Sequence, residues 1–154
     1  MKLVCAFSGD VAEWVLERIP HMNEFKDYAA IGVVNDSGVL VAGAVYHQYH
    51  PDVGDIQIAF AADDPHWAQK GTIAGILAFP FRQLGCVRIT ALTAKSNKRT
   101  RRFVEGIGFK LEGVVRKGFR TEDMCIYGLL QEEAEKWLRR IPNGKVVTER
   151  SGRA

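Results

Sequence analysis

The sequence predicts an α/β (α+β) domain in which helices cover both faces of a mixed, mostly antiparallel β-sheet. Apolar strand-like and amphipathic helix-like segments alternate along the chain in the order β-α-β-β-β-α-β-α-β-β-α. A strand, a helix and a second strand follow one another across residues 55–94, and this unit predicts one parallel pair with a right-handed crossover. Hydrophobic residues make up 47% of the 154 residues, which is enough to fill the core of one domain.

The first helix is predicted from apolar residues at helical spacing shortly after an initial strand at residues 1–6. Asp10 is the expected N-cap, with Glu13 as its capping-box partner, and Pro20 stops the helix. A second short helical turn is expected near residues 21–25.

The next elements are a hairpin and a third strand. Residues 28–34 and 39–46 are apolar strands joined by the turn Asp36-Ser37-Gly38. Polar and apolar residues alternate over 55–62, which predicts a strand with one buried face.

A helix is predicted over residues 71–84, and Pro80 should kink it or loosen one turn. Gly85 ends that helix. The remaining predicted elements are a strand at 87–94, a basic helix at 97–107 closed by Gly108, strands at 109–116 and 124–130, and a helix at 132–141. We therefore expect one domain over residues 1–141 and a flexible tail over 142–154.

Composition excludes several classes of function. No apolar run approaches the ~20 residues that span a bilayer, and the first seven residues are too short and too weakly basic for a signal peptide, so we expect a cytoplasmic protein. The three cysteines are far apart and predict neither a disulfide framework nor a zinc site. A spacing of three residues places His47 and His50 on opposite faces of a strand, so no metal site is expected there.

Two helix starts have chemistry that suits a phosphate-bearing ligand. The helix that begins near Gly71 offers free backbone N–H groups beside a glycine, although an ordinary strand–helix loop has the same features. Asn97 can cap the next helix or hydrogen-bond an amide-bearing ligand. Five basic residues, Lys95, Lys98, Arg99, Arg101 and Arg102, suit a polyanion or form a solvated helix face.

Residues 97–116, N-K-R-T-R-R-F-V-E-G-I-G-F-K-L-E-G-V-V-R, resemble the N-x-x-S…E-k-x-G-F-x-x-E-G-x-x-R block of the GCN5-related N-acetyltransferase (GNAT) superfamily. This block is typical of the branch that includes the ribosomal-protein N-terminal acetyltransferases. Residues 67–73 stand where the superfamily has its coenzyme-A motif, Q/R-x-x-G-x-G/A, and the resemblance covers roughly residues 28–130. Ala68 and Ile73 depart from that motif, and Val104 replaces a tyrosine that protonates the leaving thiolate in many members.

The resemblance implies acetyl-CoA as co-substrate, bound where the central parallel strands splay apart. Backbone groups of Ala59, Phe60 and Ala61 would hold the pantetheine arm, with Asn97 also bonded to it. The implied pyrophosphate ligands are the amides of Gln69, Lys70, Gly71, Thr72 and Ile73. Arg101 or Arg102 would meet a phosphate, and Thr100 lies beside the same site.

Direct attack on the thioester requires a neutral amine, so a general base is expected. Asp55 is the first candidate and His47 the second, while Thr100 is the candidate for handling the thiolate proton. Each of these side chains is equally compatible with a purely structural role.

Three hypotheses follow. The first is an N-acetyltransferase acting on a protein N-terminus, an amino acid, a polyamine or an aminoglycoside. The sequence shows no conspicuously acidic acceptor pocket, which disfavours polycationic substrates. The second is a nucleic-acid-modifying or nucleic-acid-binding protein of the same fold, with Arg139, Arg140, Lys145 and Arg150 as a second basic patch. The third is a fold relic without transferase activity. By analogy, residues 124–130 would form an edge strand through which two copies pair.

Overall fold

Seven strands form one sheet in the computed structural model, which describes residues 1–141. The strands are β1 (Lys2–Val4), β2 (Ala29–Val34), β3 (Leu40–His50), β4 (Asp55–Ala62), β5 (Arg88–Ala94), β6 (Lys110–Val115) and β7 (Met124–Leu130). Their spatial order is β1-β2-β3-β4-β5-β7-β6, and only the β4–β5 pair is parallel. The predicted mixed, mostly antiparallel sheet is therefore confirmed.

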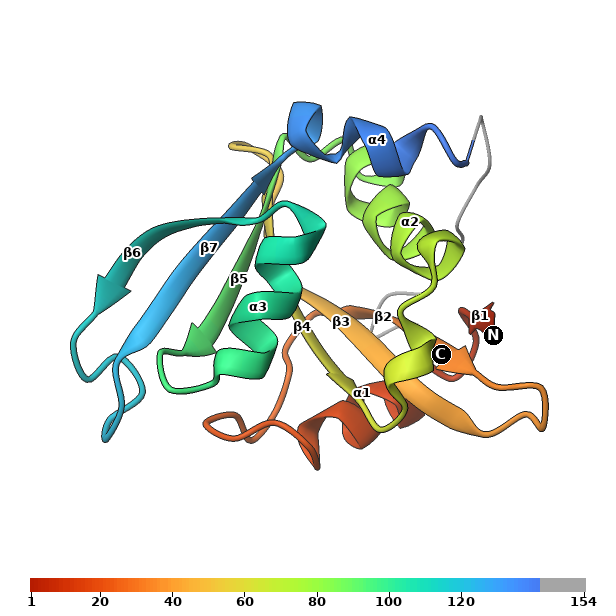
Figure 1. The fold of residues 1–154 in the computed structure, drawn as a ribbon, viewed down its shortest axis with the longest axis horizontal. Coiled ribbons are helices and arrows are strands. Elements are labelled where there is room, and N and C mark those ends of the chain that lie inside the picture. The colour runs from red at the N-terminus through yellow and green to blue at the C-terminus, as the bar shows by residue number, and fades with distance from the viewer. Residues whose placement is uncertain (142–154) are drawn as a thin grey trace.

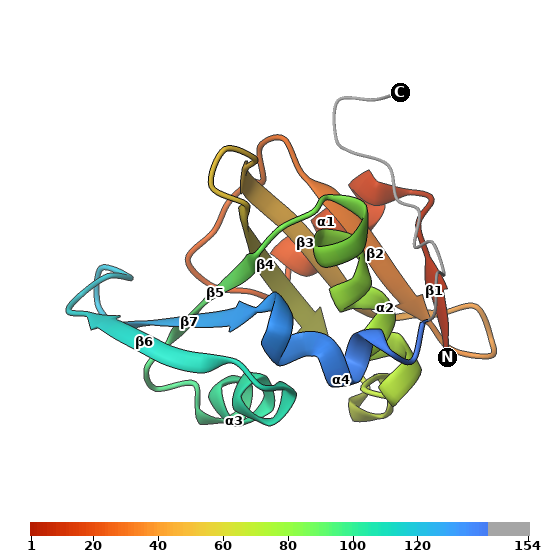
Figure 2. The ribbon, with the colours of Figure 1, turned by 90° about the horizontal axis from the view of Figure 1, so that it is seen from above.

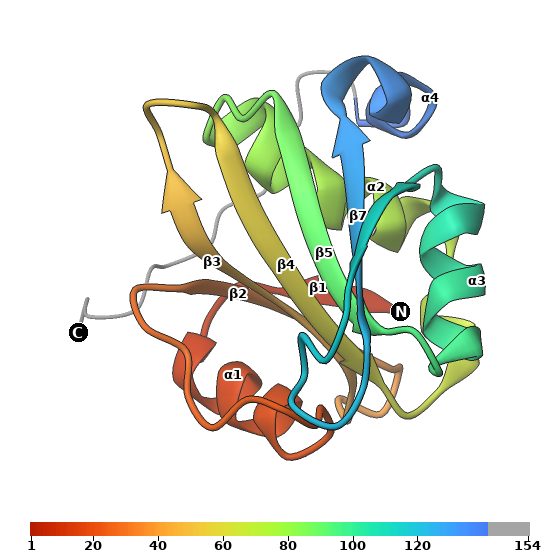
Figure 3. The same cartoon turned by 90° about the vertical axis from the view of Figure 1, so that its left-hand side faces the viewer.

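Helices cover both faces of the sheet, as predicted (Figures 2 and 3). They are α1 (Ser8–Leu16), α2 (Lys70–Ala78), α3 (Lys98–Ile107) and α4 (Glu135–Leu138). Helix α1 buries Val11 and Val15 against Val45 and Phe25 on one face, while α2, α3 and α4 enclose the larger apolar core on the other. The order of strands and α-helices along the chain matches the predicted order.

The start of α1 differs from the prediction. The helix begins at Ser8 after Phe7, whose φ of 62° is left-handed and whose side chain makes no capping hydrogen bond. Asp10 lies inside the first turn, so its carboxylate faces the positive end of the helix dipole instead of capping it, and the Asp10–Glu13 capping box is wrong. The predicted turn at 21–25 is also wrong, because His21 has a φ of 72°, which a right-handed helix does not accommodate.

The loosened turn expected at Pro80 is present. Helix α2 ends at Ala78 and continues as a π-helical turn, Phe79–Gln83, in which the Leu84 N–H donates to the Phe79 carbonyl over 3.2 Å. Proline has no N–H to donate, so the wider turn accommodates the missing α-helical bond. Gly85 follows with a φ of 70°, which glycine adopts without strain.

The C-terminal elements correct two expectations. Strand β7 pairs with β5 on one side and β6 on the other, so residues 124–130 are not a free edge, and β6 occupies the edge instead. The last predicted helix is a 3₁₀ turn, Gln131–Ala134, followed by the short α4. The predicted flexible tail at 142–154 lies outside the described residues. Within residues 1–141, no helix has the length and apolar character needed to cross a membrane.

Candidate active site

Strands β4 and β5 separate halfway along their length, which opens a gap in the middle of the sheet (Figure 1). They pair only from Asp55 to Ile58 and from Arg88 to Ala91. Beyond these residues β4 remains bonded to β3, and β5 remains bonded to β7. The backbone groups of Ala59 to Ala62 that point across the gap consequently have no strand partner on β5, and a ligand can use them.

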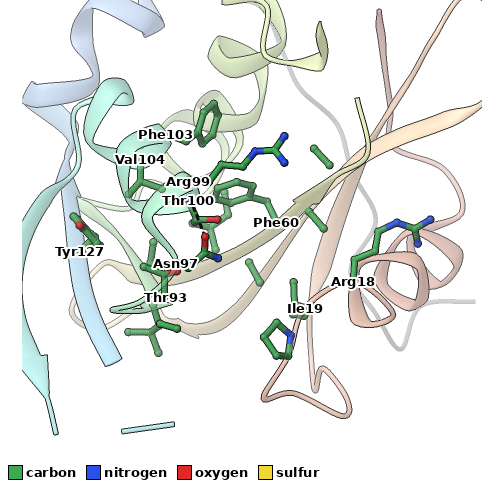
Figure 4. Close-up of a pocket in the computed structure, with 18 of the residues that line it drawn as sticks. Arg18, Ile19, Phe60, Thr93, Asn97, Arg99, Thr100, Phe103, Val104 and Tyr127 are labelled. Atoms are coloured by element: carbon green, nitrogen blue, oxygen red, sulfur yellow. Dashed lines mark hydrogen bonds between the residues drawn. The ribbon is translucent and has the colours of Figure 1, made fainter. Parts of the chain in front are cut away.

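A cavity of about 770 Å³ fills this gap and extends to both sides of it. One side is walled by α3, and Figure 4 shows Arg99 extending from that helix into the space between α3 and β4. The other side is walled by the segment after α1, including Arg18 and Ile19. Strands β3, β4 and β5 form the floor, with Ala59, Phe60 and Ala61 among the lining residues.

The start of α2 offers backbone donors close to the cavity, whose lining includes Trp67 and Ala68. Among the five amides predicted to bind pyrophosphate, the Gln69 N–H already donates to Trp67 and the Ile73 N–H to Gln69, over 2.8 and 3.0 Å. The amides of Lys70, Gly71 and Thr72 belong to the first turn of α2, where helix geometry supplies no acceptor. The predicted anion site thus narrows to three N–H groups.

The departures from the coenzyme-A motif do not obstruct this helix start. The side chain of Ile73 is buried in the main core, 7% exposed. Gly71 is exposed, and a Cβ built on it would meet nothing within 4 Å. The Thr72 hydroxyl donates to the Trp67 and Gln69 carbonyls and fixes the turn that leads into α2.

The basic residues of α3 divide into two groups. Arg99 and Arg102 line the cavity. Arg101, which the sequence analysis proposed for a phosphate, instead donates to the Tyr127 hydroxyl over 3.0 Å and to the Lys95 carbonyl over 3.1 Å. Arg101 therefore serves the packing of α3. Arg99 lines the cavity instead, although it was expected only as a member of the basic cluster and not as a phosphate ligand.

Asn97 caps α3 as predicted, because its Oδ1 accepts the Thr100 N–H over 3.1 Å. This bond uses only the amide oxygen, so the side-chain NH₂ group is left for a ligand in the cavity that Asn97 lines. Thr100 lines the same cavity, whereas Val104, one turn further along, contributes only methyl groups to its wall.

A β-bulge brings consecutive polar residues of β3 to the cavity. Neighbouring residues of a regular strand point to opposite faces, but the register shifts between His47 and His50, Gln48 has a φ of 53°, and both His47 and Gln48 line the cavity. Gln57 on β4 pairs with His47 and joins them. Among residues 1–141, none of these three side chains has a hydrogen-bond partner.

The imidazole of His47 is 7% exposed and meets the Phe25 ring edge-on, with centroids 5.0 Å apart. Burial lowers the pKa of His47 from its usual 6.5, because the charged form loses solvation. The ring is therefore neutral near pH 7 and can accept a proton.

Asp55 lies away from this chemistry. It is the first residue of β4, at the end opposite the gap, and does not line the cavity. Its Oδ1 accepts a hydrogen bond from Thr90 over 2.8 Å and lies 3.4 Å from the Arg88 guanidinium. Of the two candidate bases, only His47 lines the cavity, while Asp55 is tied to Thr90 and Arg88.

Three loops meet at the mouth of the cavity on the α1 side. The rings of His21 and Phe119 stack with centroids 4.6 Å apart, and both residues line the cavity. Glu122 joins the loops, because one carboxylate oxygen lies 3.0 Å from His21 Nε2 and the other accepts the Ser96 hydroxyl. These contacts hold the segment after α1 against the β6–β7 loop.

Solved structures of acetyltransferases share this architecture. A probable acetyltransferase is 24% identical over 70% of this chain, with a TM-score of 0.59, and the chain spans 63% of that protein. The spermidine N-acetyltransferase of Vibrio cholerae, crystallised with CoA and spermine, is 14% identical, with 87% of this chain and 97% of that one covered and a TM-score of 0.70. A putative acetyltransferase is 20% identical over 75% of this chain and 67% of its own, with a TM-score of 0.62.

These likenesses show that the chain has the GNAT fold. No protein-family model and no curated protein sequence matches this chain. None of the three structures is described as a ribosomal-protein N-terminal acetyltransferase, so the comparisons do not support that branch.

Proposed function

We propose that the protein is an acetyl-CoA-dependent N-acetyltransferase that transfers an acetyl group to a primary amine by direct attack. The gap between β4 and β5 carries this proposal, because its cavity combines unpaired strand backbone with a neutral imidazole, and the anion-suited start of α2 follows directly after the lining residues Trp67 and Ala68. The shared fold of solved acetyltransferases, one of them crystallised with CoA, agrees with it.

The residues present fit coenzyme A in three places. The backbone of Ala59, Phe60 and Ala61 faces the gap and would bond the pantetheine arm, with help from the Asn97 amide. The amides of Lys70, Gly71 and Thr72 would receive the pyrophosphate, since a helix start is positive and has free donors. Arg99 and Arg102 line the cavity and would pair with phosphate oxygens.

Acetyl-CoA supplies an acetyl group already activated as a thioester, so the protein's task is to position groups and to move protons. His47 would accept the proton of the incoming amine, directly or through water. Thr100 lines the cavity on the α3 side and would supply a proton to the leaving thiolate, which the hydrocarbon side chain of Val104 cannot do. A backbone N–H of Ala59 to Ala61 would polarise the acyl carbonyl, as an oxyanion hole does.

Titration with acetyl-CoA, followed by calorimetry and by melting temperature, tests the proposal. At about 100-fold excess over the dissociation constant, binding should stabilise the fold by about 2.7 kcal/mol. No shift at millimolar acetyl-CoA would exclude the transferase and favour a nucleic-acid-binding protein or a fold relic. Binding should also be followed by release of free CoA thiol once a suitable amine is added.

A further inference from the structure

The acceptor half of the cavity lacks negative charge. We define this half by the segment Arg18 to Met22, the bulge residues His47 and Gln48, Gln57, and Phe119. In the part of the chain that the structure describes, no aspartate or glutamate lines the cavity at all, whereas Arg18, Arg99 and Arg102 do. An amine that enters this half meets apolar groups, two glutamine amides, two imidazoles and the guanidinium of Arg18.

Two carboxylates that contact lining residues of the acceptor half are already engaged. Asp63 pairs with Arg18 in two parallel hydrogen bonds, 2.9 Å to Nε and 3.0 Å to Nη2. Glu122 is held by His21 and Ser96. Because each of these carboxylates already has a partner, neither is free to neutralise a second ammonium group on a bound ligand.

The walls of the acceptor half suit a compact apolar body. Ile19, Pro20, Met22 and Phe119 contribute apolar surface near the mouth. Gln48, which is exposed, and Gln57, which is half-buried, have side-chain oxygens without a protein partner within residues 1–141, and such oxygens accept hydrogen bonds from an amine. These oxygens can accept the hydrogen bonds of one amine nitrogen, but they cannot neutralise the charge of additional ammonium groups.

We propose that the acceptor is a primary amine carried on an uncharged, apolar body, and that the cavity disfavours polyamines. This inference rests on the proposed acetyl transfer. It separates the chain from the structurally similar spermidine N-acetyltransferase crystallised with spermine. The physical reason is that each further ammonium group would lose its hydration in a cavity whose described lining offers it no carboxylate.

The test compares phenethylamine with spermidine as acceptor, using the initial rate of free CoA thiol release at saturating acetyl-CoA. We expect kcat/KM for phenethylamine to exceed that for spermidine by at least ~10-fold, because the additional ammonium groups of spermidine would lose hydration without meeting a carboxylate in the described lining. Faster turnover of spermidine would overturn the acceptor assignment and leave the transferase intact. Acetyl-CoA binding without thiol release from either amine would overturn both.

A single isosteric change should move the preference. Gln48→Glu places a carboxylate on the exposed bulge residue of the acceptor half, and it should raise the spermidine-to-phenethylamine ratio of kcat/KM several-fold. The matched control is Gln83→Glu, because Gln83 is also exposed but lies in the π-helical turn outside the cavity. An unchanged ratio in Gln48→Glu, or the same change in Gln83→Glu, would refute the proposed charge discrimination.

Discussion

Three arginines of α3 provide a matched test of the coenzyme site, since they lie within one turn and differ only in direction. Arg99 and Arg102 line the cavity, while Arg101 is bonded to Tyr127 and to the backbone. Arg99→Ala and Arg102→Ala should each weaken acetyl-CoA binding. Both side chains are exposed, so solvent screening limits each phosphate contact to about 1 kcal/mol, or ~5-fold in Kd, and the double variant should lose ~30-fold.

Arg101→Ala should show the opposite pattern. It removes one of the two partners of the Tyr127 hydroxyl, which also donates to Glu105, and a donor to the Lys95 carbonyl, so the melting temperature should fall while Kd stays near the wild-type value. Isothermal titration gives Kd, and thermal melts without ligand give stability. Equal loss of affinity in all three single variants would refute the assignment, because a diffuse basic face would not distinguish among them.

Other substitutions test the base, the helix start and the packing of α1. His47→Gln should lower kcat ~100-fold or more and remove the loss of activity at acid pH from the pH–rate profile. Because burial lowers the folded-state pKa of His47 from 6.5, the free energy of unfolding of the wild type should fall as the pH drops below about 6.5. Denaturant titrations of the variant should show less of that fall. Gly71→Glu should weaken acetyl-CoA binding at least ~10-fold by repelling phosphate, whereas Gly71→Ala, with open space for its Cβ, should bind normally in the same titration. Gly43→Ala should lower the free energy of unfolding by about 1–3 kcal/mol, since the added Cβ would lie 2.9 Å from the side chain of Val15 in α1. An unchanged midpoint in urea unfolding would contradict that close packing.

Local patterns predicted most elements well where a few neighbouring residues decide the outcome. The cap at Asn97 and the stop at Gly108, whose φ is 128°, follow from side-chain and backbone chemistry within one turn. The same local reasoning failed at the start of α1, where Asp10 looked like a cap but Phe7 precedes the first turn in a left-handed conformation. A left-handed phenylalanine has no sequence signal, because nothing in its side chain favours that conformation.

The candidate site was harder to predict because its members come from different elements. From the sequence, Asp55 and His47 were both plausible general bases. The structure distinguishes them, because β4 and β5 diverge at the end of β4 that lies far from Asp55, and only His47 lines the resulting cavity. The β3 bulge, which turns both His47 and Gln48 toward the cavity, also gave no signal in the alternation of polar and apolar residues. Helical spacing could have grouped Arg99 with Arg102 and separated both from Arg101, but only the bond to Tyr127 shows which group faces inward.

By itself the sequence determined the order of strands and α-helices, the parallel crossover and the two helix starts with anion-binding chemistry, because periodicity and capping act over a few residues. Only the tertiary structure decided that β7 lies inside the sheet, that His47 and not Asp55 reaches the cavity, and that no carboxylate of residues 1–141 lines it. Those outcomes depend on strand register and divergence, which pairings between different strands set, some of them between residues more than thirty positions apart, as between Ile58 and Ala91.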